Sequence, residues 1–551
     1  MSSTNPFQEF RDECEKIIGI KTKLEKPPKE IDADLALPCF LLAKELKKPP
    51  HEIAKELAEK IKRKSPPPLI KRIEVSGPYV NFYAVWNRLG KMVVEQIIKE
   101  KEKYGSGKRK ERIMVEFCHP NTHKAFHIGH VRNICLGEAL SRILEYSGHQ
   151  VIRTNYQGDI GPHVAKCLWG LMNLGLKPKG NKGKWLGEVY AISNSKIEGN
   201  ETAEKEVAGI SNKLYEGKDK KLIQLWKKTR KWSLDYFDSI YKDFSVKFDR
   251  LFFESEVFKG SIKIARNLLN KGIAKMSEGA VIIDLDKYDL GVFIILKRDE
   301  DPLYSTKDLR LAELEFGYKP DKIIHVVGSE QKLYFQQLFK TFELMRKEWA
   351  DKSYHLSYGL VMLKTGKISS REGSVVLYND LIKEGMDKAE KEIKNRGVGK
   401  MENAKDIAMA AIKYAMLSRD NSRTILFDWG HVLNFEGDSG PYLQYTYARA
   451  NSILEKSNRR PSLKRIDEKW FRIIKKLVQF PDIIKISSKE MKPHYITNYL
   501  TELAAIFNEF YHSQRVIGSE DEENLLAIVN AVKTVLRNGL QLLGIKALEK
   551  M

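Results

Sequence analysis

A short apolar run followed by a long amphipathic pattern marks the first third of the chain. Residues 112–118 read Arg-Ile-Met-Val-Glu-Phe-Cys, and such a nearly continuous apolar run is typical of a strand buried in a parallel sheet. From Gly129 to Leu144 apolar side chains recur at helical spacing, and Gly148 provides a stop for the helix. Residues 150–156 form a second strand-like run. The pattern predicts a strand–turn–helix–strand unit of the size found in nucleotide-binding folds.

The segment before this unit, residues 1–106, is predicted to form a separate first domain. Two short amphipathic helices are expected at 41–46 and 53–61, because a Lys-Lys-Pro-Pro segment separates two apolar patterns of helical spacing. Residues 73–83 have an extended pattern. A polar linker at 104–111 then leads into the strand–turn–helix unit.

The part after this unit alternates between helical and extended patterns. A basic loop at 177–184 opens a lysine-rich helical stretch, so an insertion over about 166–245 is predicted. The sheet is expected to resume near Phe248, and three strand-like runs support this: 280–284, 292–296 and 323–327.

The pattern becomes almost wholly helical beyond about residue 400, with 408–417 and 473–486 as the clearest helices. A chain of 551 residues is too long for one hydrophobic core, and two to four domains are expected. We therefore predict domains at 1–106, 107–400 and 401–551.

The charge balance favours a polyanionic partner. Lys and Arg number 95 against 73 Asp and Glu, a formal net charge of +22. On charge alone RNA, DNA and acidic membrane surfaces all remain open. The alternative is a lysine-rich proteome that uses Lys to solvate protein surfaces.

The five cysteines are scattered without the paired spacing of metal ligands, which indicates reduced and mostly buried thiols. No apolar run approaches the length of a membrane span, and the first residues lack the apolar core of a secretory signal. We therefore expect a soluble cytoplasmic protein without a membrane partner.

The turn between the predicted strand and helix carries the clearest candidate chemistry. Backbone N–H groups at a helix N-terminus favour anions, and Gly129 allows the backbone to approach a phosphate closely. His127 and His130 would add donors where negative charge develops during displacement at phosphorus. The alternative is that both histidines cap the helix or pack in its first turn. The strand–turn–helix context favours the phosphate-binding function.

Four longer motifs extend this signal, and together they resemble one family. They occur in the order His119–His130, Asn155–Gly161, Gly328–Gln337 and Phe435–Tyr445. The His-Ile-Gly-His string resembles the signature of class I aminoacyl-tRNA synthetases. The four motifs in this order are similar to arginyl-tRNA synthetases, and the resemblance covers essentially the whole chain.

The resemblance implies a fold, a reaction and partners. The fold would be α/β: a Rossmann-type class I catalytic domain with an insertion, an N-terminal α/β RNA-binding domain and an all-α C-terminal anticodon-binding domain. The reaction would be ATP-dependent activation of L-arginine to arginyl-adenylate, followed by transfer to the 3′ end of tRNA(Arg), with tRNA needed even for the first step. Mg²⁺ would accompany ATP, no dedicated protein metal site is expected, and we expect a monomer. The inserted helices have an alternative interpretation as a solvated bundle without RNA contact.

Six residues match the family positions that hold arginine. Carboxylates pair with a planar guanidinium through two hydrogen bonds, which suits Glu254 and Asp308 as its ligands and Tyr304 as a wall beside it. Glu116, Asn121 and Gln331 match positions that hold the rest of the amino acid. For any one carboxylate taken alone, a surface ion pair is the alternative.

ATP is expected to contact the signature turn and a second loop. Residues 364–374 resemble the mobile Lys-Met-Ser-Lys-Ser loop of the class, in which Lys367 and Ser369 match the first and third positions. Ser370 replaces the second lysine. Many arginyl enzymes share this loss and carry a lysine before the first signature histidine, where this chain has Lys124; Arg371 is a second candidate. The resemblance thus assigns catalysis and ATP binding to this set: Lys124, His127, Gly129, His130, Lys367 and Ser369.

Two aromatic clusters are candidate tRNA contacts. Tyr79 and Asn81 match family positions that contact a D-loop base, and an aromatic side chain beside an amide suits an unpaired base. Tyr442, Tyr445 and Arg449 cluster in the helical region. In both places packing within the protein is the alternative, because Tyr442 and Tyr445 share a helix face.

Two rival functions remain open. Another class I synthetase is one, although cysteine enzymes usually carry zinc-binding cysteines and paired carboxylates suit a cationic side chain better. A catalytically silent RNA-binding paralogue is the other, supported only by the missing loop lysine. Retention of His127, Gly129, His130 and Lys367 argues against it, because RNA binding alone does not need them.

Overall fold

A five-stranded parallel sheet forms the centre of the molecule. The computed structural model describes residues 5–20, 22–28, 30–297, 303–345, 347–363, 376–397 and 400–551. The strands run in the order β11-β10-β4-β5-β6, and all neighbours are parallel. Their bounds are β4 Arg112–Glu116, β5 Gln150–Gln157, β6 Arg250–Phe253, β10 Lys322–Gly328 and β11 Ser353–Tyr358. An all-parallel sheet must be covered on both faces, as is the case here.

The predicted strand–turn–helix–strand unit is confirmed. The helix α5 (Ile128–Tyr146) connects β4 to β5, and Ile113 lies opposite Val151 in the parallel ladder. One face of β4, with Ile113, Val115 and Phe117, packs into the core that contains α5. The other face turns towards α11 (Tyr304–Phe316).

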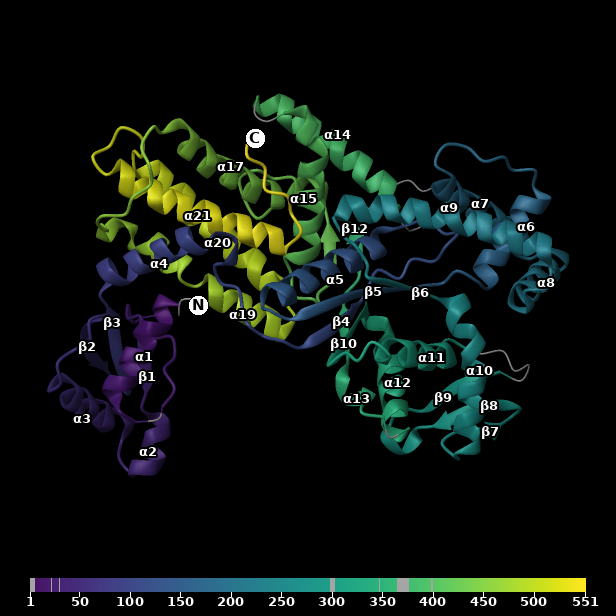
Figure 1. Ribbon diagram of the computed structural model, residues 1–551, viewed down its shortest axis with the longest axis horizontal. Helices are drawn as coiled ribbons and strands as arrows, with labels where there is room; N and C mark the ends of the chain where they lie inside the picture. The colour runs from purple at the N-terminus through teal and green to yellow at the C-terminus, as the bar shows by residue number, and fades with distance from the viewer. Residues whose placement is uncertain are drawn as a thin grey trace.

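Four insertion helices follow β5, as the lysine-rich pattern predicts (Figure 1). They are α6 Pro162–Asn173, α7 Lys182–Ile197, α8 Glu201–Glu216 and α9 Lys220–Phe244. In Figure 1 they lie at the upper right, at the end of the molecule away from the chain's N-terminus.

The second half of the chain's α/β region differs from the prediction. The runs 280–284 and 292–296 do not join the central sheet but form β8 (Ala280–Asp284) and β9 (Val292–Leu296) of a separate antiparallel sheet, with β7 (Lys275–Ser277). The seven residues 285–291 between β8 and β9 are too few for a parallel crossover, which needs a dozen or more. Only the third run, within β10, belongs to the parallel sheet. The helices α10 (Glu254–Asn270), α11, α12 (Lys332–Leu344) and α13 (Trp349–Lys352) complete this part.

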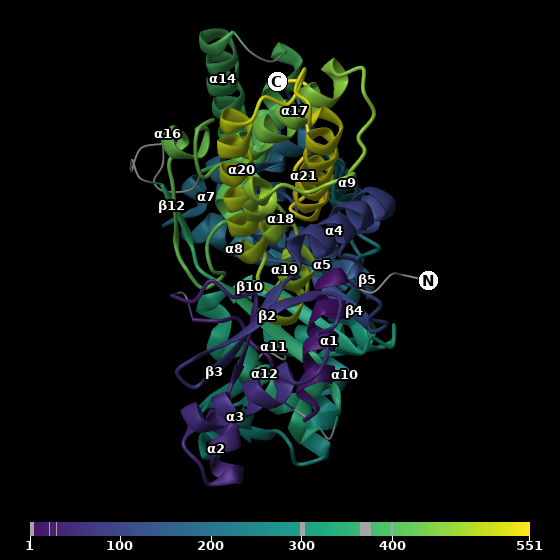
Figure 2. The same cartoon turned by 90° about the vertical axis from the view of Figure 1, so that its left-hand side faces the viewer.

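The N-terminal unit is a small sheet with helices beside it. Its strands run antiparallel in the order β1-β3-β2, with β1 Leu35–Pro38, β2 Ile70–Ser76 and β3 Tyr79–Ala84. The helices are α1 Pro6–Ile18, α2 Phe40–Leu46 and α3 Pro50–Lys62. The predicted helices and extended stretch are thus confirmed. Both views place this unit below the C-terminal helices, to which α4 (Trp86–Glu100) leads (Figures 1 and 2).

The C-terminal part is helical, as predicted, but one predicted helix is two. Residues 473–486 fall in α18 (Phe471–Leu477) and α19 (Phe480–Glu490). Pro481 explains the break, because its ring lacks an N–H and clashes with the carbonyl of residue 477 in a continuous helix. The other helices are α14 Tyr378–Arg396, α15 Ala404–Leu417, α16 Trp429–Val432, α17 Gly440–Lys456, α20 His494–Ser513 and α21 Glu522–Leu542, and a short parallel pair joins β12 (Val361–Leu363) to β13 (Ile425–Phe427).

Within the described ranges, none of the helices has the length and apolar character needed to cross a membrane.

The close packing of α5 on the sheet gives a stability prediction. A Cβ at Gly137 would lie 2.2 Å from Cγ of Phe117, so Gly137→Ala should lower the midpoint of thermal unfolding through overpacking, an effect of about 1–3 kcal/mol. Gly209 in α8 has open space around it, so Gly209→Ala should raise stability by about 0.5–1 kcal/mol. Thermal scans of both variants test this; equal midpoints for the two would contradict the packing of α5.

Candidate active site

The backbone between β4 and α5 has an uncommon conformation. Cys118, His119 and His123 have φ angles of 85°, 50° and 64°, in the left-handed region that non-glycine residues rarely adopt. Such strain persists only where the surroundings hold it. Here Asn133 accepts the N–H of Cys118 at 2.6 Å, and Asn155 accepts the N–H of His119 at 3.2 Å.

The same two asparagines connect the turn to the rest of the sheet. Asn133 on α5 also donates to the carbonyl of Val326 at 2.8 Å and to the hydroxyl of Tyr358 at 3.0 Å. Asn155 donates to Tyr241 on α9 at 3.1 Å. The turn is therefore fixed by bonds to β10, β11 and the insertion.

The two signature histidines cap α5. Nδ1 of His127 accepts the N–H of Gly129 at 3.1 Å, and Nδ1 of His130 accepts the N–H of His127 at 3.2 Å. Burial lowers the pKa of His127 to about 4 and that of His130 well below its ordinary value, so both rings are neutral at pH 7. A neutral ring whose Nδ1 accepts carries its proton on Nε2. The capping alternative and the phosphate-binding prediction are thus compatible, since each cap leaves an Nε2–H donor.

Lys124 lies beside these histidines at a large cleft. The cleft has a volume of about 1150 Å³ and is lined by Lys124, His127 and Lys184, with α7 on one side and the start of α14 on the other. The ammonium of Lys124 lies 4.9 Å from the ring centre of Tyr190, a cation–π distance. The lining also includes three carboxylates, Glu188, Glu198 and Asp380, so the positive charge is local to Lys124 and Lys184.

A second cavity opens at the carboxyl ends of the central strands. Side chains alternate along a strand, so the face of the sheet that carries Met114 also carries Glu116, and the face with Ile323 carries His325. Glu116 and His325 lie directly opposite each other in the β4–β10 ladder. The cavity has a volume of about 380 Å³, and it brings together four of the predicted arginine-binding residues: Glu116, Tyr304, Asp308 and Gln331.

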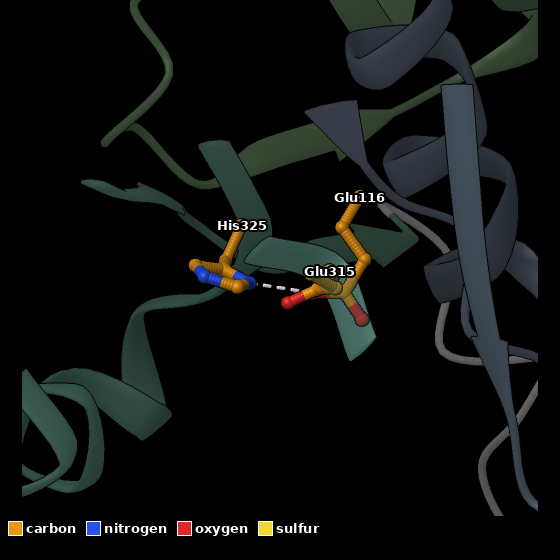
Figure 3. Close-up of side chains that lie close together, drawn as sticks. All are labelled: Glu116, Glu315 and His325. Atoms are coloured by element: carbon orange, nitrogen blue, oxygen red, sulfur yellow. Dashed lines mark hydrogen bonds and ion pairs between the residues drawn. The ribbon is translucent and has the colours of Figure 1, made fainter. Parts of the chain in front are cut away.

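Three carboxyl groups lie in this cavity, and burial raises the pKa of two of them. Nδ1 of His325 lies 2.5 Å from Oε2 of Glu116 (Figure 3). Burial by itself would raise the pKa of Glu116, but this hydrogen bond and the charges of His119 and His325 together lower it. Burial raises the pKa of Asp308 to about 7, although Tyr334 donates a hydrogen bond to it. Burial also raises the pKa of Glu315 well above its usual range. Among the described residues, no lysine or arginine lines the cavity.

Glu254 and Asn121, the other two predicted arginine-binding residues, meet at Gly158. A Cβ at Gly158 would lie 2.3 Å from Oδ1 of Asn121 and 3.3 Å from Oε2 of Glu254. The Glu254 carboxylate is already bound by Lys307, with 2.5 Å between Oε1 and Nζ. Burial raises the pKa of Tyr156, and the charges of Asp308, Glu254 and Glu116 raise it further, so all three predicted carboxylates act on this phenol.

The predicted tRNA contacts lie in other parts of the molecule. Tyr79 packs edge-on against Phe40 with ring centres 5.7 Å apart, and Asn81 is buried in the small sheet, with 1% of its surface exposed. The helical cluster of Tyr442, Tyr445 and Arg449 is half-buried and joined through Asn508. Lys367, Ser369, Ser370 and Arg371 lie outside the described residues.

Four residues that lie among the predicted arginine-binding residues were missed by the sequence analysis: Lys307, Glu315, His325 and Tyr334. Their signal was a polar residue in an otherwise apolar strand or helix face. His325 interrupts the run Ile-Ile-His-Val-Val, and Glu315 continues the helix face of Tyr304 and Asp308 at positions i, i+4 and i+11.

The capping geometry predicts the tautomers of both signature histidines. In histidine-labelled protein at pH 7, ¹⁵N shifts should show an unprotonated Nδ1 and a protonated Nε2 for His127 and His130. On acidification His127 should titrate near pH 4 and not near 6.5. An Nδ1–H tautomer, or charged rings at pH 7, would contradict the geometry of the turn.

Comparison with known proteins agrees with these features. Three family models match: "Arginyl tRNA synthetase N terminal domain" at residues 7–84, "tRNA synthetases class I (R), catalytic domain" at 93–429, and "DALR anticodon binding domain" at 443–551. The arginine–tRNA ligase of Clostridium perfringens is 35% identical over 97% of this chain and 96% of its own length. That of Halothermothrix orenii is 36% identical with the same coverage.

Solved structures share the fold. The arginyl-tRNA synthetase of Thermus thermophilus superposes with a TM-score of 0.81 at 24% identity, over 99% of this chain and 100% of that one. That of Plasmodium falciparum gives 0.77 at 19% identity, over 99% of this chain and 98% of that one. The predicted fold class is confirmed: a class I catalytic domain with a parallel sheet, an N-terminal domain and a helical C-terminal domain. The chain belongs to the arginyl-tRNA synthetase family of class I aminoacyl-tRNA synthetases.

Proposed function

We propose that this protein activates L-arginine with ATP and transfers the arginyl group to the 3′ end of tRNA(Arg). The observation that carries the choice of amino acid is the second cavity, in which Glu116 and Glu315 are buried and Asp308 is half-buried, with no lysine or arginine among the described lining residues. Buried carboxylates favour an occupant that supplies positive charge and hydrogen-bond donors, as arginine does.

Activation would proceed by in-line attack of the arginine carboxylate on the α-phosphate of ATP, with pyrophosphate leaving. This reaction needs positioning and charge stabilisation more than a protein nucleophile. The neutral Nε2–H groups of His127 and His130 are suited to donate to the phosphate oxygens, and Gly129 has no side chain to obstruct a phosphate. The backbone N–H groups of His127, Ile128 and Gly129 already donate within the protein. Lys124 supplies positive charge to the phosphates from the cleft.

Mg²⁺ is proposed to enter with ATP. His127, His130 and Lys124 are not ligands that Mg²⁺ prefers, whereas Glu188, Glu198 and Asp380 line the same cleft and offer carboxylate oxygens. The ion would be held through the phosphates of ATP, with these carboxylates as the available protein ligands.

Arginine would be oriented by the two clusters described above. Asp308 and Glu254 are the proposed guanidinium ligands, with Tyr304 beside the side chain, and Glu116, Asn121 and Gln331 hold the amino acid portion. Lys307 already forms an ion pair with Glu254, so binding of the guanidinium would require this ion pair to open or to be shared.

The basic excess of the chain supports tRNA as the second substrate. We propose domains at 1–106, 107–400 and 401–551, with Tyr79 and Asn81 contacting the D-loop region and Tyr442, Tyr445 and Arg449 contacting the anticodon arm. Because Asn81 is buried, its contact would require a local shift of the small sheet. A cytoplasmic monomer is the proposed working form.

The direct test is ATP–pyrophosphate exchange with each amino acid, with and without unfractionated tRNA. Exchange with arginine, dependent on tRNA, is expected. Exchange with a different amino acid would reassign the substrate within the class. Absence of exchange together with retained tRNA binding would favour the silent paralogue.

Removal of one side chain that donates a hydrogen bond to the phosphates should slow the reaction strongly. His130→Ala should lower turnover by about 10²–10³-fold, as for one oxyanion-stabilising donor. His130→Asn tests the reason, because Asn can still accept the capping N–H but lacks the Nε2 donor. Equal loss in both variants is expected in exchange assays; near-normal turnover in His130→Asn would reduce the role of His130 to helix capping.

Lys124 is proposed to compensate for the lysine that Ser370 replaces. Lys124→Ala should reduce exchange by about 10²-fold or more, and Ser370→Lys should restore part of it, because either cation can neutralise the same phosphates. Lys184→Ala removes a charge from the same cleft and should retain most of the activity. Lack of any restoration by Ser370→Lys would argue against compensation.

A further inference from the structure

Glu315 is a buried carboxylate for which the proposed reaction has no role so far. It lies on α11 with 1% of its surface exposed, and its Oε1 has no hydrogen-bond partner among the described residues. An uncompensated carboxylate away from water is strongly unfavourable. A partner that supplies positive charge, whether a proton or a ligand, is therefore required.

The position of Glu315 is set by the helix that carries Asp308. The two residues are seven positions apart on α11, which places them on the same face about two turns apart. Both line the second cavity, with Leu311 and Ala312 between them. Glu315 thus extends the acidic wall to the inner end of the cavity.

Figure 3 shows that Glu315 points towards Glu116 and His325, and ligand atoms of the three residues lie within 4.8 Å of one another. The other titratable groups around the cavity are Tyr304 and Asp308 from α11, Tyr334 from α12, Tyr156 from β5 and His119 from the turn. The two cationic side chains of α11 are Arg310, which pairs with Glu313, and Lys307, which is bound to Glu254.

A shared metal ion is a poor fit for this cluster. Nδ1 of His325 and Oε2 of Glu116 lie 2.5 Å apart and already share a hydrogen bond. Two ligands at right angles on one Zn²⁺, each at about 2.0–2.1 Å, would be about 2.9 Å apart. The space beside Glu315 is therefore better matched to an N–H donor of an organic cation.

We propose that Glu315 is a further arginine-binding residue, whose carboxylate receives a cationic group of the substrate together with Glu116 at the inner end of the cavity. This inference rests on the proposed function. It has a consequence for protons: burial raises the pKa of Glu315 well above its usual range, so a cation that binds beside it favours loss of the proton. Arginine affinity should accordingly increase with pH.

Isothermal titration of arginine into the full-length protein, in two buffers of different ionisation enthalpy, measures both affinity and proton release. Glu315→Gln should weaken binding by about 10-fold or more, as for loss of a charge-assisted hydrogen bond, and should release fewer protons than wild type. Glu313→Gln is the matched control, because Glu313 lies on the same helix, is half-exposed and pairs with Arg310 at 2.8 Å. The control should bind and release protons like wild type.

Glu315→Asp keeps the charge on a shorter side chain, and it should retain proton release while binding more weakly. Unchanged affinity and proton release in Glu315→Gln, with only a shifted unfolding temperature, would reduce Glu315 to a structural residue and overturn the inference. Zn²⁺ binding that is lost in Glu315→Gln without an effect on arginine would overturn it in favour of a metal site. Absence of arginine binding in the wild type would instead contradict the proposed function itself.

Discussion

The bonds that Asn133 makes at the end of β4 hold the active site together. Its side chain joins the strained turn at Cys118 to the neighbouring strand at Val326 and to Tyr358 at the sheet edge. Glu116 ends the strand on one side of this turn, and the two signature histidines begin the helix on the other. The conformation of the turn therefore fixes the separation between the amino acid cavity and the phosphate-binding helix. That separation is what an in-line reaction requires to be constant.

Electrostatics divides the site into two halves of opposite character. The phosphate side offers neutral N–H donors and the ammonium of Lys124, all suited to anions. The amino acid side concentrates carboxylates at the carboxyl ends of parallel strands, where open α/β sheets place their ligands. Because the described lining of the second cavity holds no lysine or arginine, positive charge on the substrate would complete its charge balance. Burial of these carboxyl groups is unfavourable without a cation, so recognition of the substrate depends on its charge.

The sequence allowed the central unit to be predicted because strand, turn and helix are local features. It also located the motif residues that the structure gathers around the second cavity, such as Asp308 and Gln331. Pairings between distant residues were not predictable in this way. Glu116 and His325 are 209 positions apart, and only the strand order brings them together. Similarly, β8 and β9 have the pattern of buried strands, but their short connection, not their composition, determines that they pair antiparallel.

The central claim is that positive charge on the substrate completes the second cavity. Citrulline tests it most directly, because it has nearly the shape of arginine but a neutral end group. Calorimetry should show that arginine binds at least about 100-fold more tightly than citrulline, a difference of about 2.7 kcal/mol. Comparable affinities for the two amino acids would contradict the account, because the buried carboxylates would then play no part in the choice of substrate.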